Sequence, residues 1–137
     1  MVKKTAIVLF FLFISGAIFA QQNDFYGRWV SKYTEDDISV VITFTFSASS
    51  FNGNMMFYEG DTVVAAGDQF DAEITSWSSS ANTDNATRTD YPNGYIVNIS
   101  EDGEDFPLEI FISRNRRQLT IPDLNDEVGE ILVFTKQ

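Results

Sequence analysis

The sequence predicts an all-β fold, namely an up-and-down antiparallel β-barrel of about eight strands that follows an N-terminal leader. Apolar and polar residues alternate with a period of two in several segments, turn residues separate these segments, and no window carries a sustained apolar stripe of helical period. Eight or nine short strands without helices indicate a sandwich or a barrel. Hairpin-short connections favour a meander, which closes most readily into a barrel.

The first 20 residues have the features of a secretory signal peptide. Lys3 and Lys4 form a short positive segment, an apolar segment follows, and Ala20 precedes the polar run Gln21-Gln22-Asn23-Asp24. The apolar segment is shorter than the roughly 18 to 20 residues that a membrane-spanning helix needs. We therefore expect cleavage near Ala20, a single domain over residues 21–137 without a membrane span, and a secreted or periplasmic location.

Period-two alternation justifies the strands in chain order. The clearest apolar face consists of Ile38, Val40, Ile42, Phe44 and Phe46. Successive strand side chains point to opposite faces, so this segment has one apolar and one mostly hydroxylated face. Segments 69–78 and 106–113 alternate in the same way, and the other strands are apolar runs between turns. The expected strands are residues 26–33, 38–47, 55–59, 62–66, 69–78, 94–100, 106–113, 118–121 and 130–135.

Turn residues separate these strands. Glycine supplies positive φ in turns, and Asn-Gly between apolar runs is a hairpin signal. Residues 78–90 contain no apolar residue larger than Ala, so we expect the longest loop here and expect it to be mobile. Residues 121–129 predict a shorter ordered loop, and any helix is expected within 33–37. The turns are Asn52-Gly53, Glu59-Gly60-Asp61, Ala66-Gly67-Asp68, Asn93-Gly94 and Glu101-Asp102-Gly103-Glu104-Asp105.

The composition excludes several function classes. The chain has no His and no Cys, so it has no histidine base, no thiolate nucleophile, no disulfide and no imidazole or thiolate metal site. The formal net charge is −11, and it becomes −13 when Lys3 and Lys4 leave with the leader. A chain this acidic repels nucleic acid and anionic membrane surfaces. We expect a protein that is not an enzyme, uses no cofactor and binds no nucleic acid.

The start of the expected domain resembles a known family. Gly27-Arg28-Trp29 resembles the Gly-x-Trp signature that opens the first strand of lipocalins and of small bacterial lipocalin-like (calycin) domains. Segments 42–44, 91–95 and 133–137 look similar to the small secreted members. The resemblance implies a lipocalin-like barrel in which Trp29 packs at the closed end, with an arginine from near the last strand lying across it. In this sequence the basic residue near the last expected strand is Lys136, whereas Arg114, Arg116 and Arg117 lie in a turn two strands before the end.

Seven side chains are candidates to line an apolar calyx. An eight-stranded barrel has an interior wide enough for side chains alone or for one small ligand, so the alternative is that these residues fill the core. Trp77 shares the polar face of its strand with Asp71, Glu73 and Thr75, so it is expected to be either an exposed contact point for a partner or a glycan, or a cover for a neighbouring strand. The seven ligand-binding candidates are Phe44, Phe46, Met55, Phe57, Phe70, Tyr95 and Phe111.

Two functions are consistent with these features. The first is an exported lipocalin-like protein that binds a small apolar ligand non-covalently in or at the mouth of the barrel. The alternative is a secreted protein-interaction module, such as an inhibitor or an envelope assembly component, with a filled barrel and the 78–90 loop beside Trp77 as its binding face. The acidic turns 101–105 and 123–127 lack the EF-hand spacing, so no metal is expected.

Overall fold

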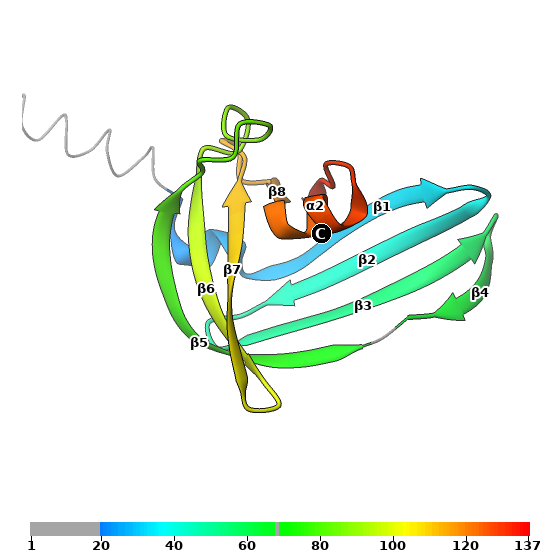
Figure 1. The fold of residues 1–137 in the computed structure, drawn as a ribbon, viewed down its shortest axis with the longest axis horizontal. Helices are drawn as coiled ribbons and strands as arrows, with labels where there is room; N and C mark the ends of the chain where they lie inside the picture. The colour runs from blue at the N-terminus through cyan, green and yellow to red at the C-terminus, as the bar shows by residue number, and fades with distance from the viewer. Residues whose placement is uncertain (1–19, 68) are drawn as a thin grey trace, which may run out of the picture.

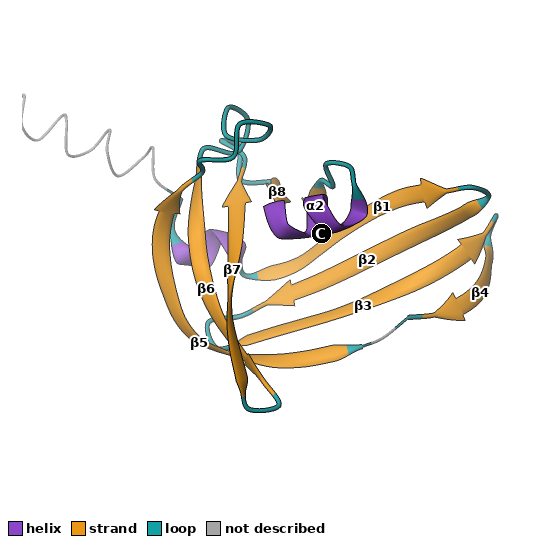
Figure 2. Ribbon diagram, viewed as in Figure 1, coloured by secondary structure: helices purple, strands orange, loops and turns teal. Residues whose placement is uncertain are grey.

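The computed structural model describes residues 20–67 and 69–137, so the expected signal peptide lies outside the described residues except for Ala20. A 3-10 helix, η1 (Gln22–Phe25), precedes the first strand, and an α-helix, α2 (Pro122–Val128), lies between the last two strands. Figure 2 shows these helical segments beside the strands. The described strands are β1 (Gly27–Glu35), β2 (Ile38–Phe46), β3 (Ser50–Glu59), β4 (Thr62–Ala66), β5 (Phe70–Ala81), β6 (Asn93–Glu101), β7 (Glu104–Ile112), β8 (Gln118–Thr120) and β9 (Phe134–Lys136).

The strands form a closed antiparallel up-and-down barrel, which confirms the predicted fold class. Strands that are neighbours along the chain pair with each other, except for β4 and β5, and β9 pairs with β1 to close the ring. β4 and β5 both pair antiparallel with β3, one after the other, so together they act as one interrupted strand of an eight-stranded barrel. In Figure 1, β1, β2, β3 and β4 reach well beyond the part of the barrel formed by β5, β6 and β7.

The apolar face of β2 is buried as its alternation predicts. Val40, Ile42, Phe44 and Phe46 belong to one hydrophobic cluster that continues through the interior faces of the other barrel strands. Thr45, on the alternate face, is exposed. Burial of this one face therefore sets the register of β2 against β1 and β3, because a slip of one residue would expose all of these side chains.

Trp29 in β1 is part of the buried interior. Its side chain is fully buried, and its Nε1–H donates a hydrogen bond to the carbonyl oxygen of Phe25 at 2.9 Å. The Nζ atom of Lys136, in β9, lies 5.4 Å from the centroid of the Trp29 ring. A cation from the last strand thus lies across the tryptophan, where the lipocalin resemblance implies an arginine.

Two Asn-Gly pairs that predict turns lie inside strands instead. Gly53 is in β3, where a Cβ atom would overlap the ring of Phe70. Gly94 is in β6, where a Cβ atom would overlap the carbonyl oxygen of Ile110 in β7. At both positions glycine permits a close approach of neighbouring atoms, which is a known use of glycine within strands.

The helix lies in a different segment from the one that the sequence predicts. Residues 33–37 contain a tight β1–β2 turn in which Asp36 has a φ of 55°. The predicted ordered loop at 121–129 is instead α2, which has Pro122 in its first turn and ends at Gly129 with a φ of 86°. Proline at the start and glycine after the end are favourable helix boundaries. Seven residues are too few to give a helical period.

Hydrogen bonds order the loop between β5 and β6, whereas its composition predicts mobility. Asn82 and Thr87 are 7% and 2% exposed. The Asn82 amide donates to the Thr87 hydroxyl and to the Tyr91 carbonyl, each at 2.9 Å, and the Thr87 hydroxyl donates to the Asp84 carboxylate at 2.7 Å. The prediction considered only apolar burial, and here buried polar side chains hold the loop instead.

Candidate functional site

The seven sequence-predicted ligand residues do not form one site. Phe44 and Phe70 line a common apolar cavity, described below. Met55 and Phe57 are half-buried against the core but do not line that cavity. All four side chains therefore contact the interior, and only the first two reach the candidate site.

The other three predicted residues lie elsewhere. The ring of Phe46 stacks on that of Phe51 at a centroid distance of 4.5 Å. Tyr95 contacts the ring of Phe25 in an edge-to-face arrangement at 5.6 Å. Phe111 is 2% exposed but lies outside the core cluster, because it alternates along β7 with interior residues. Phe46 and Tyr95 thus serve as interior packing, and Phe111 lies on the opposite face of its strand.

Trp77 does not occupy the exposed polar face that the alternation predicts. A register shift in the pairing of β5 with β6, just before Trp77, reverses the phase of the alternation. The half-buried indole ring packs against the core, and its Nε1–H donates to the Ala48 carbonyl at 2.9 Å. Its ring centroid lies 6.3, 6.4 and 5.6 Å from those of Phe25, Phe46 and Tyr95. Trp77 is therefore a packing residue, and the expected exposure is wrong.

An apolar cavity of about 230 Å³ lies between α2 and the inner faces of the barrel strands. Its polar lining residues are all carboxylates, namely Glu101, Asp123 and Glu127. The remaining lining is apolar and aromatic-rich, and it comes from β2, β3, β5 and β7 and from the segment around α2. The apolar lining residues are Phe44, Phe51, Phe70, Phe106, Leu108, Ile121 and Leu124.

Three phenylalanines, Phe44, Phe51 and Phe70, form an aromatic wall of this cavity. The Phe44–Phe51 and Phe51–Phe70 ring centroids are 5.0 Å apart, and the Phe44–Phe70 centroids are 5.9 Å apart. Gly53 leaves room for the Phe70 ring, as described above. Phe106 in β7 also lines the cavity and is 42% exposed, so the cavity is open to solvent beside it.

α2 is held over the cavity by a buried polar residue. The Asn125 amide donates to the Thr120 hydroxyl at 2.8 Å, and the Asn125 side-chain oxygen accepts from the Leu132 N–H at 2.8 Å. On the same helix, Leu124 and Val128 pack against the core. The hydrogen bonds connect α2 to β8 and to the segment before β9, so the helix has a defined position as one side of the cavity.

The carboxylates at the cavity have no basic partner among the described residues. Glu101 ends β6, and Asp123 and Glu127 are four residues apart on α2, so these two lie on one helix face. The salt bridge found among residues 20–67 and 69–137 joins Arg116 to Asp24, at 2.9 Å, and involves none of the three. The rim of the cavity therefore carries uncompensated negative charge.

The negative charge beside α2 also affects Tyr33 in β1. Burial raises the pKa of Tyr33 above its ordinary value, and the charges of Glu35, Glu130 and Glu127 raise it further. Glu127 also lines the cavity. The negative potential around α2 thus extends to the neighbouring β1 strand.

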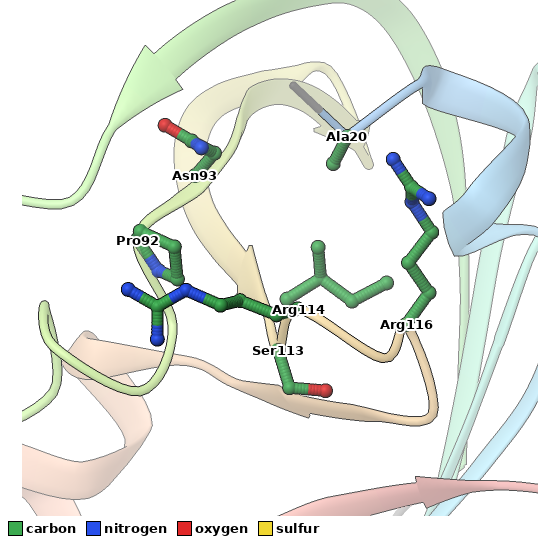
Figure 3. Close-up of a pocket in the computed structure, with 7 residues that line it drawn as sticks. Ala20, Pro92, Asn93, Ser113, Arg114 and Arg116 are labelled. Atoms are coloured by element: carbon green, nitrogen blue, oxygen red, sulfur yellow. The ribbon is translucent and has the colours of Figure 1, made fainter. Parts of the chain in front are cut away.

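A second cavity, of about 280 Å³, lies at the end of β6 and β7 opposite to the apolar cavity. Figure 3 shows the residues that line it. Arg114 and Arg116 flank it, but Arg114 donates to the Thr89 carbonyl at 2.9 Å and Arg116 pairs with Asp24. Ala20, the last residue of the expected leader, borders this cavity. The apolar cavity is the better candidate, because every residue that lines it belongs to the expected domain.

The sequence prediction missed much of the lining of the apolar cavity. Phe51 precedes the Asn-Gly pair that predicts a turn, so the sequence predicts no strand at this residue. Phe106 and Leu108 share the predicted apolar face of their strand, and this alternation is the sequence feature from which their place in the lining could be predicted. Leu124 and the two α2 carboxylates depend on a helix whose seven residues carry no periodic signal.

Comparisons of the chain with protein-family models, with curated proteins and with solved structures find no match. The part of the chain that the structure describes contains no helix that is long and apolar enough to cross a membrane. The fold and the site together define a small, closed, antiparallel β-barrel with an apolar cavity that has an acidic rim.

Proposed function

We propose that the protein is an exported, lipocalin-like binding protein that takes one small apolar ligand non-covalently in the cavity beside α2. The observation that carries this proposal is the convergence of seven apolar residues around an open space beside α2. Burying apolar ligand surface contributes about 25 cal/mol per Å². The cavity of about 230 Å³ is below the roughly 300–1,000 Å³ typical of ligand pockets, which favours a small ligand.

Sequence and structural features together support the lipocalin-like part of the proposal. The Gly27-x-Trp29 motif opens β1, the meander closes with eight strands, and Lys136 lies across Trp29. The positive and apolar segments before Ala20 support export. The absence of His and Cys supports a non-catalytic role. The proposal therefore describes a carrier or binding protein outside the cytoplasm.

The interaction-module alternative has less support. It depended on an exposed Trp77 beside a mobile loop. Trp77 packs against the core, and the loop after β5 is hydrogen-bonded within itself through Asn82 and Thr87. Neither observation favours a protein partner over an apolar ligand.

The proposal is tested by titrating the mature protein with 1-octanol, a small neutral amphiphile, and measuring saturation-transfer-difference NMR. We expect saturable binding at one site. Phe106→Ser should weaken binding about tenfold, because it removes an exposed aromatic side chain that lines the cavity. The matched control is Val63→Ser, since Val63 is 49% exposed on β4 and does not line the cavity.

Two results would contradict the proposal. One is the absence of saturable octanol binding by the folded protein. The other is an equal loss of affinity in Phe106→Ser and Val63→Ser, which would mean that octanol associates with exposed apolar surface in general. Circular dichroism of both variants establishes that each is folded before titration.

A further inference from the structure

We propose that the cavity selects a ligand whose apolar body carries a positively charged head, such as a primary or quaternary ammonium group. This inference rests on the proposed ligand-binding function and specifies its ligand class. The observation behind it is that the apolar wall ends at a rim on which the polar residues are all acidic, namely Glu101, Asp123 and Glu127.

The charge of these carboxylates is available to a ligand. None of the three carboxylate groups forms a side-chain hydrogen bond or a salt bridge within residues 20–67 and 69–137, and Glu101 is half-buried. Asp123 and Glu127 project from successive turns of α2 on the same helix face. A cationic head at the rim would therefore meet unpaired carboxylates from β6 and from α2, whereas an anionic head would be repelled by the same groups.

The aromatic lining is suited to the same ligand class. Phe44, Phe51 and Phe70 pack into one wall, and the more exposed Phe106 lies at the solvent side. The face of an aromatic ring carries negative electrostatic potential, which attracts an ammonium group. Alkyl groups bound to the cationic nitrogen can contact these rings while the charge faces the carboxylates.

The charge of the whole chain acts in the same direction. The protein carries 20 acidic and 9 basic side chains. A cleft with charge of one sign and low-dielectric walls concentrates the field and raises the local concentration of oppositely charged ligands. Burial raises the pKa of Tyr33 in β1, and the charges of Glu35, Glu130 and Glu127 raise it further, so the negative charge beside α2 also acts on this neighbouring strand. A fatty-acid carboxylate is the apolar ligand type that this field disfavours.

The test compares three ligands with the same eight-carbon chain, namely octylammonium, 1-octanol and octanoate, at pH 7 and low ionic strength. We expect octylammonium to bind at least tenfold more tightly than octanoate, with octanol between them. The triple variant Glu101→Gln, Asp123→Asn, Glu127→Gln should reduce that ratio to about threefold or less. Its affinity for octanol should stay unchanged, because the apolar wall is intact.

A second triple variant is the matched control. Asp36→Asn, Asp37→Asn, Glu73→Gln changes the net charge by the same amount at exposed positions that do not line the cavity. It should keep the preference for octylammonium. If octylammonium, octanol and octanoate all bind with equal affinity, charge selection is overturned and the proposed function stands. An equal loss of preference in both triple variants would also overturn it, whereas the absence of octanol binding contradicts the proposed function itself.

Discussion

At the scale of single residues, Trp29 and Lys136 join the first and last strands of the barrel. The two residues are paired in the β1–β9 register, and the Lys136 ammonium lies over the indole ring. The same ammonium donates to the Asp24 carbonyl at 3.0 Å. One side chain thus links β9, β1 and the 3-10 turn before β1. Lys136 therefore adds contacts of its side chain to the backbone pairing of β9 with β1.

Lys136→Met should lower the free energy of unfolding by about 1 kcal/mol. The substitution keeps an apolar stem of similar length but removes the cation–π contact with Trp29 and the hydrogen bond to Asp24. Denaturant titration followed by tryptophan fluorescence measures the change. Lys136→Arg is the control and should retain most of the stability, since it keeps the positive charge. Equal destabilisation by both variants would contradict an electrostatic role for this residue.

The Tyr33 hydroxyl links stability to pH. Burial raises the pKa of this phenol, as do the charges of Glu35, Glu130 and Glu127, so the folded-state pKa exceeds the unfolded value of about 10. The fold therefore favours neutral Tyr33, and this stabilisation is complete below pH 10 and is lost as the pH rises through the folded-state pKa. Above pH 10, the free energy of unfolding should fall more steeply in the natural protein than in Tyr33→Phe. Parallel curves for the two proteins would show that Tyr33 does not contribute.

At the scale of secondary-structure elements, α2 depends on few contacts for its position. It is seven residues long, which is too short for a helix to be stable alone in water. Its position depends on the side chains of Leu124 and Val128 in the core and on the two hydrogen bonds of Asn125. The helix that carries two rim carboxylates is therefore the element of the cavity most sensitive to a single substitution.

Asn125→Ala should destabilise the protein by about 2–3 kcal/mol. It leaves the buried Leu132 N–H without its acceptor and the Thr120 hydroxyl without one partner. Asp126→Ala, at the next and exposed helix position, controls for changes in helix propensity and should cost less than about 0.5 kcal/mol. Thermal unfolding by circular dichroism measures both. Similar melting temperatures for the two variants would mean that Asn125 does not hold α2.

The strands could be predicted from the sequence because an apolar face with a period of two is a direct consequence of burial on one side of a sheet. Each of the nine expected strands overlaps an observed strand. Which face of a strand a residue occupies is harder to predict. A register shift in β5 turns Trp77 inward, and no residue type in the sequence signals this shift. Asn-Gly pairs are also ambiguous, since Gly53 and Gly94 serve close packing inside strands.

The candidate site was only partly predictable for a related reason. Phe44 and Phe70 stand on predicted apolar faces, and both line the cavity. Whether an interior aromatic residue borders empty space or packs against another ring depends on contacts between distant segments, as Phe46 and Tyr95 illustrate. The acidic rim combines the end of β6 with one face of α2, and no local pattern connects these two segments.

At the scale of the whole molecule, the fold must accommodate a large excess of negative charge. The net charge is −11 for the full chain, and the structure shows one salt bridge, Arg116–Asp24, within the described residues. Mutual repulsion among the unpaired carboxylates opposes the compact state. The closed ring of strands and its apolar interior must offset this repulsion without disulfides, because the chain has no cysteine.

Salt should therefore stabilise the protein. Raising the NaCl concentration from 0.01 M to 0.15 M shortens the screening length from about 30 Å to about 8 Å, which weakens repulsion between surface carboxylates. We expect the melting temperature to rise by about 3 °C, with an equal rise in KCl because screening does not depend on the identity of the cation. The variant Asp36→Asn, Asp37→Asn, Glu73→Gln carries less negative charge and should show a smaller rise. A melting temperature that is independent of salt, or an equal salt dependence in this variant, would mean that packing rather than charge repulsion limits stability.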